Sequence, residues 1–315
     1  MGVVIPSKVF IQHAEKPRFE GIKRLIEKSL HRRTYNRVII KPNLCLARKI
    51  PAATTDPLLM RYVTRYFVRC SKEVIAVESD GLINTADEAF DILGIRKAVE
   101  EEGGKVLNMS NYYPEKYIDH IFPHDLLVNL PILKTHEFTI ASGAVKNMFG
   151  MIPDKKRVKH HPKIAKVLVG MCKKYNKQLI IMDGIRGMEG HGPTKGKIVN
   201  MKVLIGGTNP AAIDRVMCKL MGFSLREVPH IEYACRILNP DGVKIECEGV
   251  ELEKLIKSFE KPKLDPITKV KMWVWRHEMP NDIMFVSPLY KITRSFGIPL
   301  RKAIRHALKM RNIDK

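Results

Sequence analysis

The sequence lacks a long apolar run. No segment of the 315 residues is apolar over the roughly 20 positions that a membrane-spanning helix needs. The N-terminal residues from Met1 to Pro6 also lack a basic stretch followed by an apolar run and a small-residue cleavage site. We therefore expect a cytoplasmic protein with no transmembrane segment and no secretory signal.

Closely spaced cysteines are missing as well. The six cysteines, at positions 45, 70, 172, 218, 235 and 247, form no Cys-x-x-Cys pair. Ferredoxin-type iron–sulfur clusters need closely spaced thiolates, so no such cluster is expected. In a cytoplasmic chain we expect reduced thiols that are mostly buried.

The best-known catalytic signatures are also absent. The chain has no Gly-x-Ser-x-Gly elbow, no His-Glu-x-x-His zinc helix and no glycine-rich loop that ends in Gly-Lys-Ser or Gly-Lys-Thr. These absences leave the reaction class unassigned, and with it the question of whether the protein is an enzyme. They also leave the oligomeric state open.

Acidic residues are few. The chain has 33 Asp and Glu against 55 Lys and Arg, a net charge of +22. From Lys254 to the C-terminus there are 15 basic and 5 acidic residues, a net of +10 in about a fifth of the chain. A positive potential attracts polyanions and anionic substrates. Three kinds of partner follow: an anionic small molecule, a nucleic acid, or an anionic membrane surface contacted by the tail.

Short β-rich runs alternate with helical stretches along the chain. This alternation predicts an α/β fold with a mostly parallel sheet flanked by helices. The expected strands include residues 38–40, 74–77, 126–133, 179–182 and 203–205. The expected helices are residues 19–30, 57–70, 85–102 with a break at Gly94, 140–149, 162–175 and 211–221. We predict an α/β domain over residues 1–260 and a basic, partly amphipathic helical extension over residues 261–315.

Polar side chains follow several of the predicted strands. They are Lys41, Asn43, Glu78, Asp80, Lys134, His136 and Asp183. In open α/β sheets, ligands bind outside the carboxyl ends of the strands. If the strands are parallel, these side chains share one edge of the sheet.

The segment from Leu130 to Gly150 has the most candidate site residues. A strand is expected to deliver Lys134 and His136 to an exposed loop, and Thr139 or Ser142 to cap a helix with Lys146 and Asn147 in its first two turns. A helix N-terminus beside cationic side chains is typical of an anion site. Each residue alone fits a solvated surface position. The four together favour function.

These patterns predict a pocket for a carboxylate or phosphate compound. Burial can move the pKa of a lysine or an aspartate toward neutrality, which makes Lys134, His136 and Asp183 candidates for acid–base catalysis. The candidate ligand-binding residues are Lys41, Asn43, Lys146, Asn147, Gly190 and Gly192. The two glycines belong to a glycine-rich stretch over residues 183–196, which is either a close approach to a ligand or a mobile surface loop.

Three further features each allow more than one interpretation. Glu78, Asp80 and Asp183 are candidate ligands of a divalent cation, although no spacing among them is diagnostic. The basic segment from Pro153 to Pro162 is a lid over an anion, a nucleic-acid contact or a solvated loop. The amphipathic stretch from Ile298 to Met310 either lies on a membrane or a partner, or packs on its own domain.

Several short motifs, taken together, resemble domain-of-unknown-function family 362. They are Lys41-Pro42-Asn43, Thr55-Asp56-Pro57, Glu78-Ser79-Asp80-Gly81, Leu130 to His136, Val145 to Gly150, Asp183-Gly184 and Asn209 to Asp214. The resemblance implies one coherent domain and a prokaryotic family that is largely uncharacterised. Some members of that family have an added ferredoxin-like iron–sulfur module, whose cysteines this sequence lacks. The resemblance implies no substrate.

Overall fold

The computed structural model separates the chain into two compact units. It describes residues 6–31, 34–81, 83–112, 125–153, 157–239, 242–264 and 266–277. One unit comprises residues 1–155 and 164–264, and the other comprises residues 156–163 and 265–315. The predicted domain boundary at residue 261 stays a prediction, and the predicted helix over residues 298–310 lies outside the described residues.

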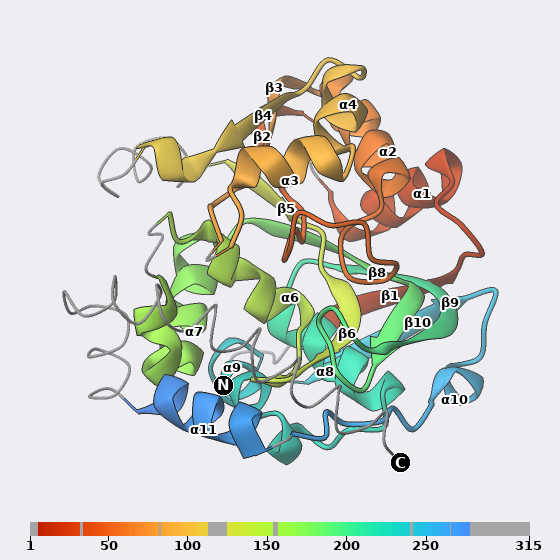
Figure 1. Ribbon diagram of the computed structural model, residues 1–315. Helices are drawn as coiled ribbons and strands as arrows, with labels where there is room; N and C mark the ends of the chain where they lie inside the picture. Colours follow the sequence, from red (N-terminus) through yellow and green to blue (C-terminus); the bar gives the residue numbers. More distant parts are fainter. Residues whose placement is uncertain are drawn as a thin grey trace, which may run out of the picture. The chain divides into compact units, whose positions relative to one another are not determined.

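The first unit is built on a mostly parallel sheet, which confirms the predicted fold class (Figure 1). The strand order is β10-β1-β9-β8-β5-β2-β3-β4, and within the described residues β9 alone runs against its neighbours in this order. β6 pairs with β8 in parallel and with β7 in the antiparallel sense. The strands are β1 (Ser7–His13), β2 (Tyr35–Lys41), β3 (Ser71–Glu78), β4 (Lys105–Asn108), β5 (Leu126–Asn129), β6 (Ile132–His136), β7 (Ile140–Ala141), β8 (Gln178–Glu189), β9 (Lys197–Gly207) and β10 (Val243–Glu248).

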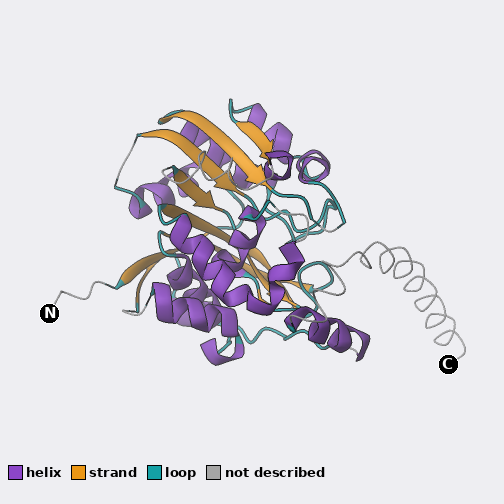
Figure 2. Ribbon diagram, turned by 90° about the vertical axis from the view of Figure 1, so that its left-hand side faces the viewer, coloured by secondary structure: helices purple, strands orange, loops and turns teal. Residues whose placement is uncertain are grey.

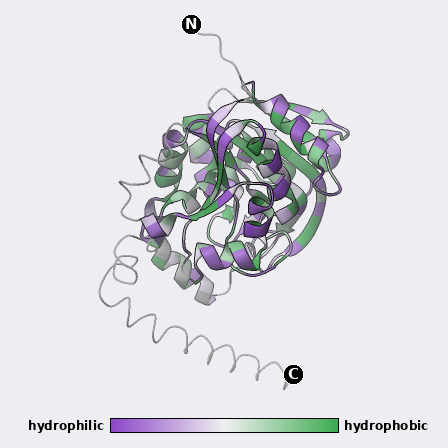
Figure 3. Cartoon of the chain, turned by 90° about the horizontal axis from the view of Figure 1, so that it is seen from above, coloured by the Kyte–Doolittle hydropathy of each residue, from purple (hydrophilic) through white to green (hydrophobic). Residues whose placement is uncertain are grey.

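Helices cover both faces of this sheet (Figure 2). Side chains alternate along the central strands, so Val38 and Ile40 of β2 join one core and Ile39 joins the other. Burial on both faces is usual for parallel sheets and explains the near-continuous apolar strands (Figure 3). One face packs against α1 (Phe19–Ser29), α2 (Pro57–Val68), α3 (Ala86–Ile92) and α4 (Ile95–Glu100). The other packs against α6 (Gly143–Asn147), α7 (Ile164–Lys174), α8 (Pro210–Leu220) and α9 (Pro229–Leu238).

Short helices complete both units. The first unit contains η1 (Met109–Tyr112), η2 (Met148–Met151), η4 (Leu225–Glu227) and α10 (Leu252–Leu255). The described part of the second unit consists of η3 (Arg157–Lys163) and α11 (Pro266–Arg276). In the described residues, no helix has the length and apolar character to cross a membrane. The cytoplasmic location stays a prediction.

Several local predictions are confirmed. Asp56 caps α2 by accepting a hydrogen bond from the backbone N–H of Leu58, and Pro57 occupies the first helical position. The predicted break between α3 and α4 falls at Gly94, whose φ of +75° favours glycine. All six cysteines are unpaired, but only half of them are buried, namely Cys172, Cys218 and Cys235.

Other local predictions are wrong. The apolar run over residues 126–133 is two strands, because Pro131 has no N–H to continue the ladder. β6 runs on to His136, so Lys134 lies inside a strand and is 1% exposed rather than on an exposed loop. β8 does not end before Asp183, because its hairpin with β9 continues the pairing to Glu189. Ile140 belongs to β7 rather than to a helix.

Candidate functional site

The first polar element at the carboxyl edge of the sheet is a buried ion pair. Lys41 ends β2 and Glu78 ends the neighbouring β3, which brings Lys41 Nζ within 2.6 Å of Glu78 Oε2. The two side chains are 1% and 5% exposed. Gly150 packs directly on this pair, since a Cβ there would lie 2.5 Å from Glu78 Oε1. Lys41 and Glu78 therefore largely neutralise each other inside the protein.

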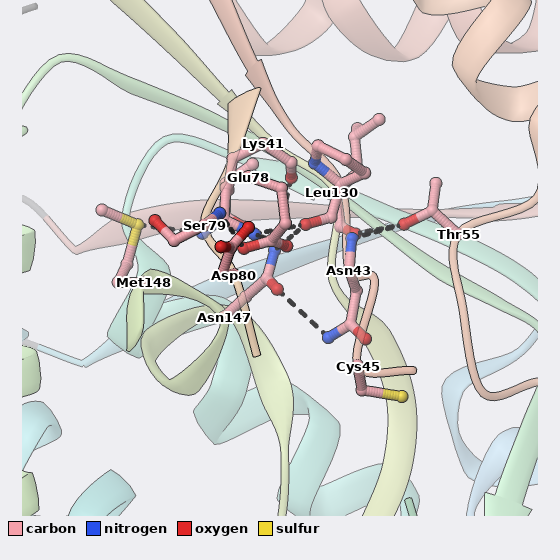
Figure 4. Close-up of polar contacts among 12 residues, drawn as sticks. Lys41, Asn43, Cys45, Thr55, Glu78, Ser79, Asp80, Leu130, Asn147 and Met148 are labelled. Carbon is pink, nitrogen blue, oxygen red and sulfur yellow. Dashed lines mark hydrogen bonds and ion pairs between the residues drawn. The ribbon is translucent and has the colours of Figure 1, made fainter. Parts of the chain in front are cut away.

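Three buried asparagines extend this polar region, and two of them, Asn43 and Asn147, are labelled in Figure 4. The side-chain amide of Asn43 donates to Asn147 Oδ1 over 3.1 Å, and the two side chains point toward each other. Asn147 Nδ2 donates to Asn129 Oδ1 over 2.7 Å, and Asn129 donates to the carbonyl of Ala144 over 3.0 Å. This chain of amides ties β2, β5 and α6 together.

Lys134 is buried beside the same amides. Its Nζ donates to Asn43 Oδ1 over 2.9 Å and to the carbonyl of Ala53, and lies 3.6 Å from the thiol of Cys45. None of the described carboxylates pairs with it. Burial lowers the pKa of Lys134. Lys134 therefore joins Asn43 and Ala53, which lie near the two ends of one loop.

Thr55 closes that loop a second time. Its hydroxyl accepts from the backbone N–H of Asn43 over 2.7 Å and donates to the carbonyl of Leu130 over 3.1 Å. The backbone N–H of Thr55 donates to the carbonyl of Asn43 over 3.0 Å. The loop over residues 43–55 is thus held at its base by Lys134 and Thr55. We call it the clamped loop.

The clamped loop forms one wall of a pocket of about 740 Å³. The other walls come from the segment after β1, the start of α2, the end of α3, and the hairpin of β8 and β9. The lining residues are Glu15, Lys16, Pro17, Lys49, Ile50, Pro51, Ala52, Thr54, Thr55, Asp56, Pro57, Leu93, Asp183, Ile185, Arg186, Asn200 and Lys202. We refer to it as the edge pocket.

The basic side chains of the edge pocket differ in whether they form ion pairs. Lys202 pairs with Glu15, with Nζ 2.9 Å from Oε1. Lys16, Lys49 and Arg186 make no ion pair and no side-chain hydrogen bond with any described residue. Three cations therefore stay available to a bound anion.

The backbone around the edge pocket is strained. Ala52 and Lys202 both line it and both have positive φ, at +59° and +56°. Such conformations cost non-glycine residues on the order of 1–3 kcal/mol and concentrate at ligand sites.

Asp183 is the buried acid of the edge pocket. Its Oδ1 accepts from the backbone N–H of Ile185 over 3.0 Å, and 9% of the residue is exposed. Burial raises the pKa of Asp183 to about 6, and the nearby charge of Asp56 acts in the same direction. The hydrogen bond from Ile185 and the charge of Arg186 oppose that rise.

The remaining predicted site residues lie elsewhere. His136 Nδ1 accepts from the backbone N–H of Phe138 over 3.0 Å. Lys146 lies near His230, and burial together with the Lys146 charge lowers the pKa of His230 to about 3. Gly190 accepts from the hydroxyl of Thr135 over 2.9 Å, and a Cβ on Gly192 would collide with the carbonyl of Thr135. None of the four predicted residues lines the edge pocket.

The candidate metal ligands are occupied by other contacts. Glu78 pairs with Lys41, and Asp80 Oδ1 accepts from the backbone N–H of Ala86 over 2.9 Å and from Asn108 Nδ2 over 2.8 Å. Over the described residues, no three His, Cys, Asp or Glu side chains are grouped so that they would hold a metal ion. A divalent cation stays a prediction.

The basic segment from Pro153 to Pro162 is described only in part. Residues 154–156 lie outside the described residues, and residues from Arg157 onward form η3. A nucleic-acid contact through this segment stays a prediction.

Sequence reasoning missed the cations of the edge pocket and one asparagine of the amide chain. Lys16, Lys49 and Arg186 come from three segments far apart in the sequence, so no local pattern relates them. Asn129 had a usable signal, because it is a polar residue within the apolar run over residues 126–133.

The family model described as a domain of unknown function, DUF362, matches residues 38–219. The chain belongs to this family. The matched span includes the Lys41–Glu78 pair, the amide chain, the clamped loop and Asp183. Thylakoid-associated protein sll1697 of Synechocystis sp. is 26% identical over 232 residues, which cover 67% of this chain and 71% of that protein. No solved structure matches the chain.

Proposed function

We propose that this DUF362 protein binds an anionic small molecule, with a carboxylate or phosphate group, in the edge pocket. The observation that supports this most is the set of three cations, Lys16, Lys49 and Arg186, which line the pocket and form no ion pair or side-chain hydrogen bond with any described residue. Positively lined concave sites concentrate anions. An arginine guanidinium matches carboxylate and phosphate oxygens in a two-point contact.

The pocket has the size and the polar groups that a small ligand needs. Its volume of about 740 Å³ lies within the roughly 300–1,000 Å³ of typical ligand pockets. Thr54, Thr55 and Asn200 add neutral hydrogen-bonding groups to its wall. In this proposal the buried Lys134 and Asn43 shape the clamped loop and do not contact the ligand.

Sulfate titration by calorimetry at constant ionic strength tests the proposal. Wild type is compared with Lys49→Ala and Arg186→Ala. Loss of one charged hydrogen bond, about 1.4 kcal/mol, weakens binding about tenfold. Lys173→Ala, at an exposed position of α7, is the matched control and should bind like wild type. Equal affinity in all four proteins, or no sulfate binding by wild type, would contradict the proposal.

Peripheral association with an anionic membrane is a second candidate function. The relative from Synechocystis sp. is named as a thylakoid-associated protein. In this chain α11 exposes Val270 and Trp273, at 63% and 54%, three residues apart and so on one helix face. Tryptophan beside basic side chains suits the lipid headgroup region.

Vesicle flotation tests the second candidate. The full-length protein should float with phosphatidylglycerol vesicles at low salt and not with phosphatidylcholine vesicles. Trp273→Ala should reduce flotation, whereas Tyr112→Ala, at another exposed aromatic position, should not. Absence of flotation with both lipids would rule this candidate out.

A further inference from the structure

Lys134, His136 and Asp183 are the three residues predicted to take part in acid–base chemistry, and one of them lines the edge pocket. Lys134 is enclosed by Asn43, Cys45 and Ala53, and it does not line the pocket. His136 also lies outside the lining. Asp183 lines the pocket and lies on β8, a strand at the centre of the sheet.

The groups around Asp183 come from each element that borders the pocket. On β8, Arg186 follows it and the N–H of Ile185 holds Oδ1. Asp56 stands at the start of α2, and its charge acts against that of Asp183. The remaining charged groups of the lining are Glu15 and Lys16 after β1, Lys49 in the clamped loop and Lys202 on β9.

One carboxyl oxygen of Asp183, Oδ1, accepts a hydrogen bond within the protein, and the other, Oδ2, makes none with the described residues. Oδ1 accepts from the backbone N–H of Ile185. This hydrogen bond is possible both when Asp183 is ionised and when its other oxygen is protonated. A proton bound at Oδ2 would leave the contact at Oδ1 in place. An acid in this position exchanges its proton without breaking the contact that fixes its orientation.

We propose that Asp183 is the acid–base residue of the edge pocket and that the ligand is an oxyacid whose anionic group lies beside it. This inference rests on the proposed function of the pocket. In the proton transfer, the carboxyl of Asp183 gives its proton to an oxygen or carbon of the ligand and becomes a carboxylate, or the reverse. No oxidant, reductant or further reactant is required.

Bound anion and ionised Asp183 repel each other, so binding should be linked to proton uptake. Free Asp183 has a pKa raised to about 6 by burial, and an adjacent anion raises it further. At a pH between the pKa of Asp183 in the free protein and its pKa in the complex, the complex holds more protons than the free protein. The affinity for the anion should therefore rise as the pH falls from about 8 to about 6, and level off below the pKa of Asp183 in the free protein.

The test is calorimetry of sulfate binding to the full chain at pH 6.5 in two buffers that differ in ionisation enthalpy. Sulfate does not titrate in this range, so any proton uptake belongs to the protein. Wild type should take up a measurable fraction of a proton for each sulfate bound. Asp183→Asn should bind sulfate at least as tightly, with no uptake and no dependence on pH.

Glu232→Gln is the control, because it removes a carboxylate at an exposed position of α9 outside the lining of the edge pocket. It should keep the proton uptake of wild type. As a measurement independent of substitution, the ¹³C carboxyl signal of Asp183 should titrate to a higher pH when sulfate is present. Uptake that persists in Asp183→Asn, or pH-independent binding by wild type, would overturn the inference. Failure of wild type to bind sulfate would overturn the proposed function first.

Discussion

Two lysines at the same sheet edge are stabilised in different ways. Lys41 meets a carboxylate, Glu78, at 2.6 Å. Lys134 meets an amide oxygen, a carbonyl and a thiol instead. A buried charge without its partner is costly, so the first lysine depends on Glu78 while the second tolerates a neutral environment through a lowered pKa.

Glu78→Gln should therefore be strongly destabilising. The substitution keeps the shape of the side chain but removes the carboxylate that pairs with the buried Lys41, and breaking a buried ion pair costs about 3–5 kcal/mol. Urea denaturation should show this loss in the free energy of unfolding. Glu251→Gln, in the exposed pair with Lys254, should change it by less than about 1 kcal/mol. Equal effects of the two substitutions would show that the Lys41–Glu78 pair does not matter for stability.

The clamped loop shows how one residue acts through another. Lys134→Met removes the hydrogen bonds to Asn43 and Ala53. The carbonyl of Ala53 keeps the contact from the thiol of Cys45, whereas Asn43 Oδ1 loses its donor, and a buried acceptor left unpaired costs about 1–3 kcal/mol. Amide hydrogen exchange over residues 43–55 should accelerate, and sulfate affinity should fall because Lys49 loses its fixed position. Lys173→Met should change neither. Unchanged exchange in Lys134→Met would mean that Thr55 alone holds the loop.

At the scale of single elements, α6 begins in a way that the sequence did not predict. Ser142 makes no cap, and the carboxylate of Asp214 on α8 instead accepts from the N–H groups of Ala144 and Val145, at 2.5 and 2.9 Å. Burial raises the pKa of Asp214 to about 7. Gly143 lies against this carboxylate with a φ of +88°.

Gly143→Ala should be destabilising for two reasons. Its backbone conformation disfavours a Cβ, and that Cβ would collide with Asp214. The combined cost should reach about 2 kcal/mol or more. Gly170→Ala is the control, because it lies within α7 with open space around it, and it should stabilise by about 0.5–1 kcal/mol. Thermal unfolding measures both. A neutral Gly143→Ala would show that α6 adapts its start.

Elements with strong local signals were predictable, and elements set by pairing were not. Asp56-Pro57 fixes the start of α2 and Gly94 fixes the break after α3 by local chemistry, so both followed from the sequence. β8 extends past Gly184 because β9 pairs with it, and no local pattern in either strand predicts this pairing. β6 buries Lys134 because the clamped loop supplies the partners for its amine.

Over the whole molecule, topology decides which side chains meet. The parallel order β8-β5-β2-β3 brings Lys41 and Glu78 to one edge, as the strand ends predict, and places Asn129, which was not predicted, at the same edge. It does not bring His136, Gly190 or Gly192 into the edge pocket. The cations of that pocket come from β8, the clamped loop and the segment after β1, so only the folded chain relates them.

The most direct test of the central proposal locates an anion in a crystal of the protein. Selenate resembles sulfate and scatters anomalously, so a crystal soaked at a saturating concentration reveals where it binds. We expect an anomalous peak in the edge pocket, in contact with Lys49 or Arg186, and a weaker peak in Arg186→Ala soaked at the same concentration. An edge pocket without selenate at saturation, with peaks confined to other surfaces, would contradict the proposed anion site.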